Sequence, residues 1–145
     1  MRFADCSIGK PYAKKTAWEQ DCIEVPAVCR RDGRFYRFYG GAYNNAPQQI
    51  GCAVSDDGSA WERLSDRPFL PNGKPGAWNA SESGHPFVFT DAFGNTPLFF
   101  QGNDDSGRIW LVRYIVDKNI FSAYNRKHGR NASYCAAGGS QSWGD

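Results

Sequence analysis

Short apolar and aromatic segments separated by turn sequences make up the first half of the chain. These segments are residues 23–29 (IEVPAVC), 34–40 (RFYRFYG), 48–55 (QQIGCAVS) and 61–64 (WERL). Arg31-Asp32-Gly33 and Asp56-Asp57-Gly58 are tight-turn sequences between them. The pattern predicts four short strands with short connections, which is an antiparallel meander.

The same pattern returns about 60 residues later. The second group comprises residues 85–90 (HPFVFT), 96–101 (TPLFFQ), 108–116 (RIWLVRYIV) and 120–124 (IFSAY). Pro26 and Gly33 align with Pro86 and Gly94, with one residue inserted between the two matches. Repeated four-stranded meanders are typical of propeller blades, whereas two unrelated meanders would form a β-sandwich. We favour the repeat because spacing, turns and aromatic positions all agree.

The expected fold is therefore all-β, a partial β-propeller of about two and a half antiparallel four-stranded blades. We expect the propeller domain to span residues 1–125, with blades at about 22–66 and 83–125 after the outer strand of an earlier blade. Residues 126–145 are polar and Gly/Ser-rich, which predicts a flexible tail. A closed propeller needs at least four blades. We therefore expect a homo-oligomer, or further blades on the N-terminal side.

Composition supports this fold class and excludes several kinds of partner. The 145 residues are 41% hydrophobic, 22% charged and 15% aromatic, with 16 Gly and 8 Pro, which favours a globular all-β domain. The net charge is +2 without a basic stripe, so we expect no nucleic-acid partner. No apolar run reaches membrane-spanning length, and no signal peptide is visible at the N-terminus. The five cysteines are odd in number and lack a CxxC pair, and Cys29 and Cys52 fit buried thiols.

Four stretches of the sequence resemble motifs of one enzyme group. They are residues 3–15 (FADCSIGKPYAKK), 22–26 (CIEVP), 51–61 (GCAVSDDGSAW) and 83–88 (SGHPFV). They resemble, in order, an outer-strand ending, an "E-[GA]-P" blade opening, "G-x-A-x-S-x-D-G-x-x-W" and a "G-x-G-H-x-x-V" blade opening. The chain thus resembles the five-bladed β-propeller glycosidases of glycoside hydrolase family 43 and its relatives in families 32, 62 and 117, over two to three blades.

The resemblance implies a site at the first residues of the innermost strands. Glu24 matches the general acid of these enzymes. His85 matches their active-site histidine, which often lies beside a metal ion, and Ca²⁺ is the cofactor that such a site would take. The family's base aspartate and its second aspartate belong to blades upstream of the glutamate. Nothing in this chain matches them, so we expect the catalytic base to come from outside it.

Several loop residues are candidates for binding sugar. Aromatic rings stack on sugars, and amides and carboxylates bond their hydroxyl groups. The candidates are Tyr43, Asn44, Trp78, Asn79, Gln101 and Asp104. Ordinary loop packing is the alternative for Tyr43, Asn44, Trp78 and Asn79, and a solvated turn is the alternative for Asp104.

These observations favour a glycoside hydrolase-like protein that acts on or recognises plant or algal polysaccharide. The resemblance implies the arabinofuranosidase or xylosidase type, with Glu24 as the acid. A non-catalytic carbohydrate-binding or degenerate propeller fragment is the main alternative, and a structural assembly component is another. The resemblance also implies a secreted or periplasmic protein, and a cytoplasmic location stays open.

Overall fold

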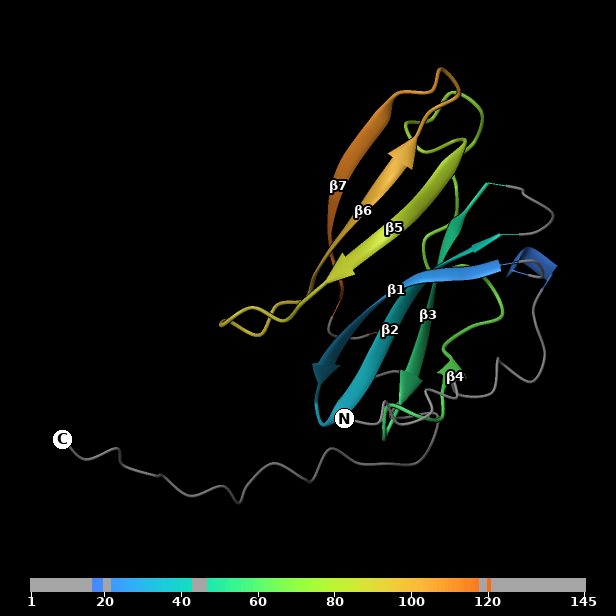
Figure 1. The fold of residues 1–145 in the computed structure, drawn as a ribbon. Coiled ribbons are helices and arrows are strands. Elements are labelled where there is room, and N and C mark those ends of the chain that lie inside the picture. Colours follow the sequence, from blue (N-terminus) through green and yellow to red (C-terminus); the bar gives the residue numbers. More distant parts are fainter. Residues whose placement is uncertain (1–16, 20–21, 43–46, 118–119, 121–145) are drawn as a thin grey trace, which may run out of the picture.

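The computed structural model describes residues 17–19, 22–42, 47–117 and 120, and these form two antiparallel sheets (Figure 1). The first sheet has the order β1-β2-β3-β4, and the second has the order β5-β6-β7. The strand bounds are β1 Cys22–Arg31, β2 Arg34–Ala42, β3 Gln49–Ser55, β4 Glu62–Arg63, β5 Glu82–Val88, β6 Pro97–Asn103 and β7 Ile109–Ile115. A short 3₁₀ helix, η1 (Ala17–Glu19), precedes β1. The described part of the chain contains no helix long and apolar enough to cross a membrane.

The all-β class and the antiparallel meanders are confirmed, with one corrected strand boundary. The first sheet has four strands and the second has three in the described residues, so a four-stranded sheet is seen for the first blade and not for the second. Most of the predicted fourth strand, residues 121–124, lies outside the described residues, as do residues 1–15 and the tail 126–145. β5 also begins at Glu82, three residues before the predicted strand. Its first residues are polar or small, so the apolar pattern missed them although they pair with the end of β6.

The two sheets share a distinctive irregularity near the start of their first strands. Val25 and Pro26 of β1 together oppose one residue of β2, and His85 and Pro86 of β5 likewise oppose one residue of β6. Val25 and His85 have positive φ angles of 47° and 50°, a conformation that residues other than glycine rarely adopt. The same bulge at the same position supports the repeat that the sequence pattern predicted.

The repeat extends further upstream than the sequence analysis found. The Trp18 ring lies over Gly41 of β2, where an added methyl group would be 2.6 Å from the indole. The Trp78 ring covers Gly102 of β6 in the same way, and a methyl group there would overlap the indole. Each sheet is thus preceded by an Ala-Trp pair whose indole packs on a glycine. Only glycine leaves enough space for that contact.

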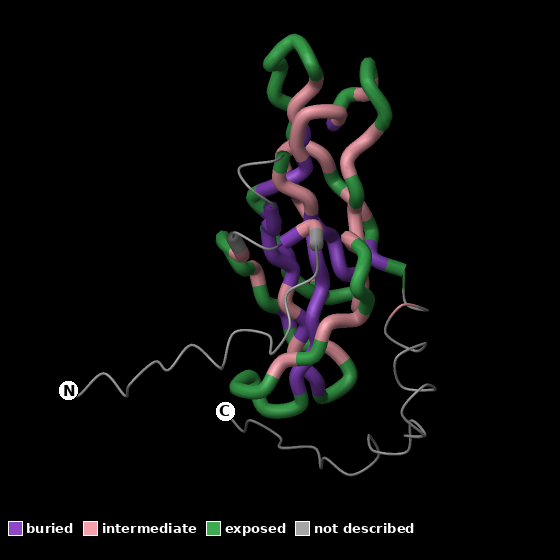
Figure 2. Tube along the Cα trace, turned by 90° about the vertical axis from the view of Figure 1, so that its right-hand side faces the viewer, coloured by how far each residue is buried: buried purple, intermediate pink, exposed green. Residues whose placement is uncertain are grey.

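The core lies between the two sheets. Figure 2 shows the buried stretches in the middle of the fold and the exposed turns at its two ends. The buried apolar side chains are Cys29, Tyr36, Phe38, Ile50, Cys52 and Val54 from the first sheet, and Val88, Leu98, Phe100 and Val116 from the second unit. Phe69, from the linker after β4, joins the sheets because its ring meets Phe38 at 5.3 Å and Tyr114 at 6.1 Å. Cys29 and Cys52 are buried free thiols, as predicted.

The outer face of the second sheet is apolar and exposed. Phe87 is 61% exposed and Leu111 is 82% exposed, and Phe89, Ile109 and Ile115 are also exposed. Leu111 occupies the register position that Ile50 holds in the first sheet, where Ile50 is fully buried against the second sheet. The exposed face of the second sheet is therefore equivalent to the face through which the first sheet packs on the second.

Candidate functional site

The two predicted catalytic residues lie at the same end of the fold. Glu24 directly precedes the bulge of β1 and His85 is part of the bulge of β5, and the two strands lie side by side in Figure 1. Both side chains are exposed. A backbone hydrogen bond closes the gap between the sheets there, because the Ser83 N–H donates to the Gln48 carbonyl at 2.9 Å. The fold thus brings the starts of β1 and β5 together.

Gln48, just before β3, connects Glu24 to the second sheet. Its side-chain Nε2 donates a hydrogen bond to Glu24 Oε1. A methyl group built on Gly84 would lie 2.6 Å from Gln48 Oε1 and 2.7 Å from Glu82 Oε1. Gln48 therefore lies between Glu24, which it bonds, and Gly84, beside which Glu82 also lies. We give the name polar cluster to six residues: Glu24, Gln48, Glu82, His85, Gln101 and Asn103.

The rest of the polar cluster orients Glu82. Asn103 Nδ2 donates to Glu82 Oε2 at 3.1 Å, and Gln101 Nε2 donates to Asn103 Oδ1 at 3.0 Å. His85 Nε2 lies 3.9 Å from Glu82 Oε1. This distance is too long for a direct hydrogen bond and is close enough for a bridging water. The cluster offers two carboxylates, three amides and an imidazole to a ligand rich in hydroxyl groups.

Two of the predicted sugar contacts have internal partners. The Trp78 ring covers Gly102 and meets Phe100 at 5.9 Å, although 39% of the residue remains exposed. Asn79 is buried, and its Nδ2 donates to Ser83 Oγ at 2.9 Å and to a linker carbonyl. These contacts support the packing alternative for both residues, and a sugar contact at Trp78 stays a prediction.

Asp104 organises the turn between β6 and β7. Its Oδ1 accepts hydrogen bonds from the Ser106 hydroxyl at 2.6 Å and from the backbone N–H groups of Ser106 and Arg108. Its Oδ2 accepts from Trp110 Nε1 at 3.3 Å. These donors, led by the Ser106 hydroxyl, lower the pKa of Asp104 to about 2. Tyr43 and Asn44 lie outside the described residues.

The donor set around His85 does not fit a calcium ion. Calcium takes six to eight oxygen ligands. Within the described ranges, no group of three or more His, Cys, Asp or Glu side chains is close enough to hold a metal ion. Glu82 supplies a carboxylate beside His85. We therefore derive no step through a metal at this position.

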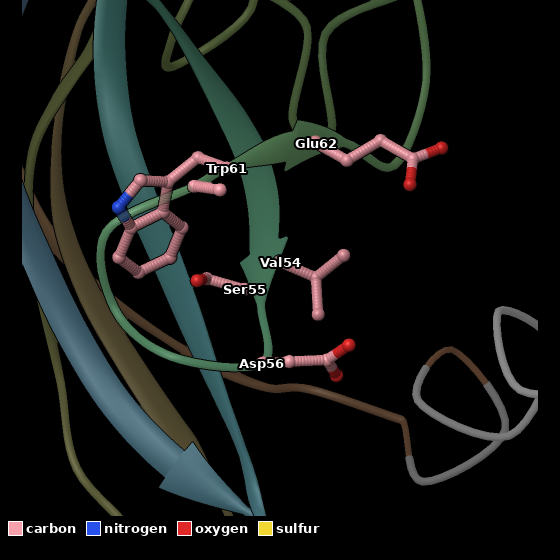
Figure 3. Close-up of a pocket in the computed structure, with 6 residues that line it drawn as sticks. Val54, Ser55, Asp56, Trp61 and Glu62 are labelled. Atoms are coloured by element: carbon pink, nitrogen blue, oxygen red, sulfur yellow. The ribbon is translucent and has the colours of Figure 1, made fainter. Parts of the chain in front are cut away.

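A separate hollow of about 210 Å³ lies at the opposite end of the first sheet (Figure 3). Val54, Ser55, Asp56, Ala60, Trp61 and Glu62 line it. Its turn is held by Asp57, which accepts backbone bonds from Ser59 and Ala60, while Trp61 Nε1 donates to the Gly58 carbonyl. The "S-x-D-G-x-x-W" motif is thus explained as a self-bonded turn.

Sequence reasoning missed Gln48 and Glu82. Gln48 was included in a predicted strand, and Glu82 was placed in a long loop. Neither has a motif of its own, because their meeting around Gly84 depends on how the two sheets approach each other. The sequence repeat gave one signal that pointed to this site, because equivalent strands of two blades, here β1 and β5, begin at the same end of the fold.

Comparison with known proteins supports the fold. No family model matches the sequence, and no curated protein is similar to it at a significant level. A family 117 glycoside hydrolase from Zobellia galactanivorans is similar in structure, with a TM-score of 0.60, 19% identity, and coverage of 76% of this chain and 33% of that one. Fructan 1-exohydrolase IIa from Cichorium intybus has a TM-score of 0.58 and 15% identity, and the match covers 72% of this chain and 19% of that one. A GH43_1 enzyme from Xanthomonas citri has a TM-score of 0.53 and 17% identity, and the match covers 66% of this chain and 29% of that one.

The chain therefore resembles the propeller-type glycoside hydrolases, as its motifs predicted, and at these identities the likeness concerns the fold. It spans a third or less of the length of the three structures compared.

Proposed function

We propose that this chain carries the acid half of a glycosidic-bond-cleaving site, with Glu24 as general acid. The observation that supports the proposal most is the place of Glu24. It stands at the start of β1, at the bulge, bonded to Gln48 and beside the start of the next sheet. The chain resembles glycoside hydrolases in fold, and the motif resemblance assigns the acid to this position. The substrate class is a plant or algal polysaccharide with arabinofuranosyl or xylosyl residues.

The chemistry requires a second carboxylate. Protonated Glu24 gives its proton to the glycosidic oxygen while the bond from that oxygen to the anomeric carbon breaks. A water molecule adds to the anomeric carbon and loses its proton to the base. Glu82 is one candidate, because its carboxylate and the Gln48 amide that bonds Glu24 both lie beside Gly84. A carboxylate from a preceding blade or a second copy, as the family pattern implies, is the other source.

The remaining polar cluster suits sugar recognition. Gln101 and Asn103 form a hydrogen-bonded row that ends on Glu82, and His85 is exposed beside it. Amides and imidazole both donate to and accept from hydroxyl groups. These groups also favour the second candidate, glycan binding without hydrolysis, which needs Gln101, Asn103 and His85 but no proton transfer.

Three matched variants separate the two candidates. Hydrolysis of arabinofuranosides and xylosides is measured for the wild type, Glu24→Gln, Glu82→Gln and Glu62→Gln, together with glycan binding by calorimetry. Glu62 is an exposed control at the other end of the first sheet. We expect Glu24→Gln to lower the rate by about 10²–10⁴-fold and Glu62→Gln to leave it unchanged. Full activity of Glu82→Gln would assign the base to another segment. Binding without any hydrolysis in the wild type would establish the second candidate instead.

A further inference from the structure

The side-chain amide of Gln48 lies in a slot between the two sheets. Gly40, which pairs with Glu24 across β1 and β2, forms one wall, and Gly84 of β5 forms the other. A methyl group on Gly40 would be 3.0 Å from Gln48 Oε1, and one on Gly84 would be 2.6 Å from it. Normal carbon–oxygen contacts are longer than both distances, so the slot fits the amide because both walls are glycine.

Gln48 is held by a backbone hydrogen bond, and one of the two polar atoms of its side-chain amide is hydrogen-bonded. Its carbonyl accepts the Ser83 N–H at 2.9 Å, so the residue is attached to the second sheet. Its Nε2 donates to Glu24 Oε1. Its Oε1 is buried and accepts no hydrogen bond in the described structure. A buried acceptor without a donor is unfavourable, and the nearest carboxyl group is Glu24 itself.

A general acid changes its hydrogen-bonding character in each turnover. Glu24 as a carboxylate can only accept, and as a carboxylic acid it also donates through its O–H. The O–H that is transferred must lie on Oε2, the oxygen that Gln48 does not hold, because a proton given to the amide could not reach the leaving oxygen. Oε1 accepts from Nε2 in both forms, so the amide keeps the carboxyl in one orientation and leaves Oε2 for proton transfer.

We propose that Gln48 is the positioning residue of Glu24 and holds the acid in place in both of its protonation states. The proposal rests on the proposed function, since only a proton donor needs one carboxyl oxygen held so that the other faces the leaving oxygen. Gln48 touches no reacting atom in this role. It acts by keeping the Glu24 carboxyl aimed at the leaving oxygen before and after proton transfer.

The other titratable groups at this end must be separated from Glu24 in the test. β5 brings Glu82 and His85 to the slot, and β2 contributes the uncharged Gly40. Glu82 Oε1 also faces Gly84, so its ionisation reaches the Gln48 amide. Variants that lack each carboxyl separately therefore accompany the measurement.

The first test does not need activity. The side-chain NH₂ resonances of Gln48 are followed by NMR in the full chain from pH 3 to pH 8. We expect them to shift with pH in the wild type and in Glu82→Gln, to shift less in Glu24→Gln, and to stay constant through the acid range when both substitutions are combined, because Glu82 also reaches the amide. Gln49, whose Oε1 accepts the Asn72 N–H at 3.1 Å, is the matched internal control and must not follow Glu24. Gln48 resonances that ignore Glu24→Gln would overturn the proposal.

The second test uses turnover. Gln48→Leu removes the amide, and Gly84→Ala displaces it, because the added methyl group meets only the mobile ends of Gln48 and Glu82. We expect Gln48→Leu to lower kcat by about ten- to a hundredfold with KM changed less than about threefold. Gly84→Ala should lower kcat in the same direction, and its unchanged thermal unfolding would show that it folds. Gln49→Leu should retain wild-type kcat.

The outcomes separate the proposed function from the role of Gln48. A wild type without hydrolysis whose Gln48 resonances still follow Glu24 contradicts the proposed function and leaves the Gln48–Glu24 coupling established. An active wild type with an unchanged kcat in Gln48→Leu overturns the positioning role. A loss of kcat in Gln48→Leu without any change in the shape of the pH–rate profile also overturns it, because removing an N–H donor from Glu24 removes an interaction that favours the carboxylate over the acid.

Discussion

Glu19 provides the sharpest test of how the first sheet is held together. Glu19 is the last residue of η1 and is completely buried. It accepts a hydrogen bond from the Tyr39 hydroxyl at 2.9 Å and forms an ion pair with Arg63 of β4, whose side chain is 11% exposed. Glu19→Ala removes the negative charge and leaves the buried guanidinium without it. Breaking one side of a buried ion pair costs about 3–5 kcal/mol.

That loss is large for a domain whose total stability is about 5–15 kcal/mol. The unfolding temperature should therefore fall by about 10–20 °C. Urea unfolding followed by circular dichroism measures the change directly, with the slope of the transition as a check on two-state behaviour. Glu62→Ala, an exposed neighbour of Arg63 on β4, is the control and should stay within about 0.5 kcal/mol.

The double variant Glu19→Ala/Arg63→Met separates charge from packing. Removing both charges should recover part of the lost stability, because the cost of an unpaired buried charge disappears. A Glu19→Ala loss below about 1 kcal/mol would refute this reasoning. A double variant that is as unstable as the sum of its two single variants would also refute it, since independent sites show no coupling.

Three further predictions follow from the packing and the turns. We propose that the chain self-associates through the outer face of the second sheet, so Leu111→Lys, at a residue that is 82% exposed, should shift light scattering towards monomer without lowering stability. The folded-state pKa of Asp104 is about 2, below its ordinary value of 3.8, so its contribution to stability is present above about pH 4 and is lost as the pH falls towards 2. Thermal unfolding of Asp104→Asn should therefore differ from wild type at neutral pH and converge with it in acid. Burial raises the pKa of Cys29 to about 11 and that of Cys52 well above its ordinary value, so neither thiol should react with iodoacetamide at pH 8 before unfolding, as read by peptide mass spectrometry.

Local sequence patterns predicted the strands, because alternation, turn residues and the spacing of Pro26 and Pro86 act within a few residues. The same patterns failed where an element depends on distant contacts. β5 begins at Glu82 because Glu82, Ser83 and Gly84 pair with the end of β6, and their polar and small side chains carry no apolar signal. The Trp18 and Trp78 equivalence was visible in the sequence as a repeated Ala-Trp pair.

The candidate site was predictable only in part. The motif resemblance placed Glu24 and His85 at strand starts, and the structure puts those starts together. The sequence offered a turn as the alternative for Asp104, and it did not indicate which turn groups the carboxylate bonds, which are those of Ser106 and Arg108. Gln48 becomes relevant only because two glycines from different sheets leave a slot for its amide.

The central claim is that Glu24 donates a proton to a leaving oxygen. The most direct measurement compares Glu24→Gln with wild type on two substrates that share a sugar and differ in leaving group. A nitrophenolate leaving group needs little protonation, whereas an alkyl or sugar alcohol needs it strongly. We predict a loss of about 10²–10⁴-fold for the alcohol and a much smaller loss for nitrophenol. Equal losses for both leaving groups, or no loss for either, would contradict the assignment of Glu24 as the general acid.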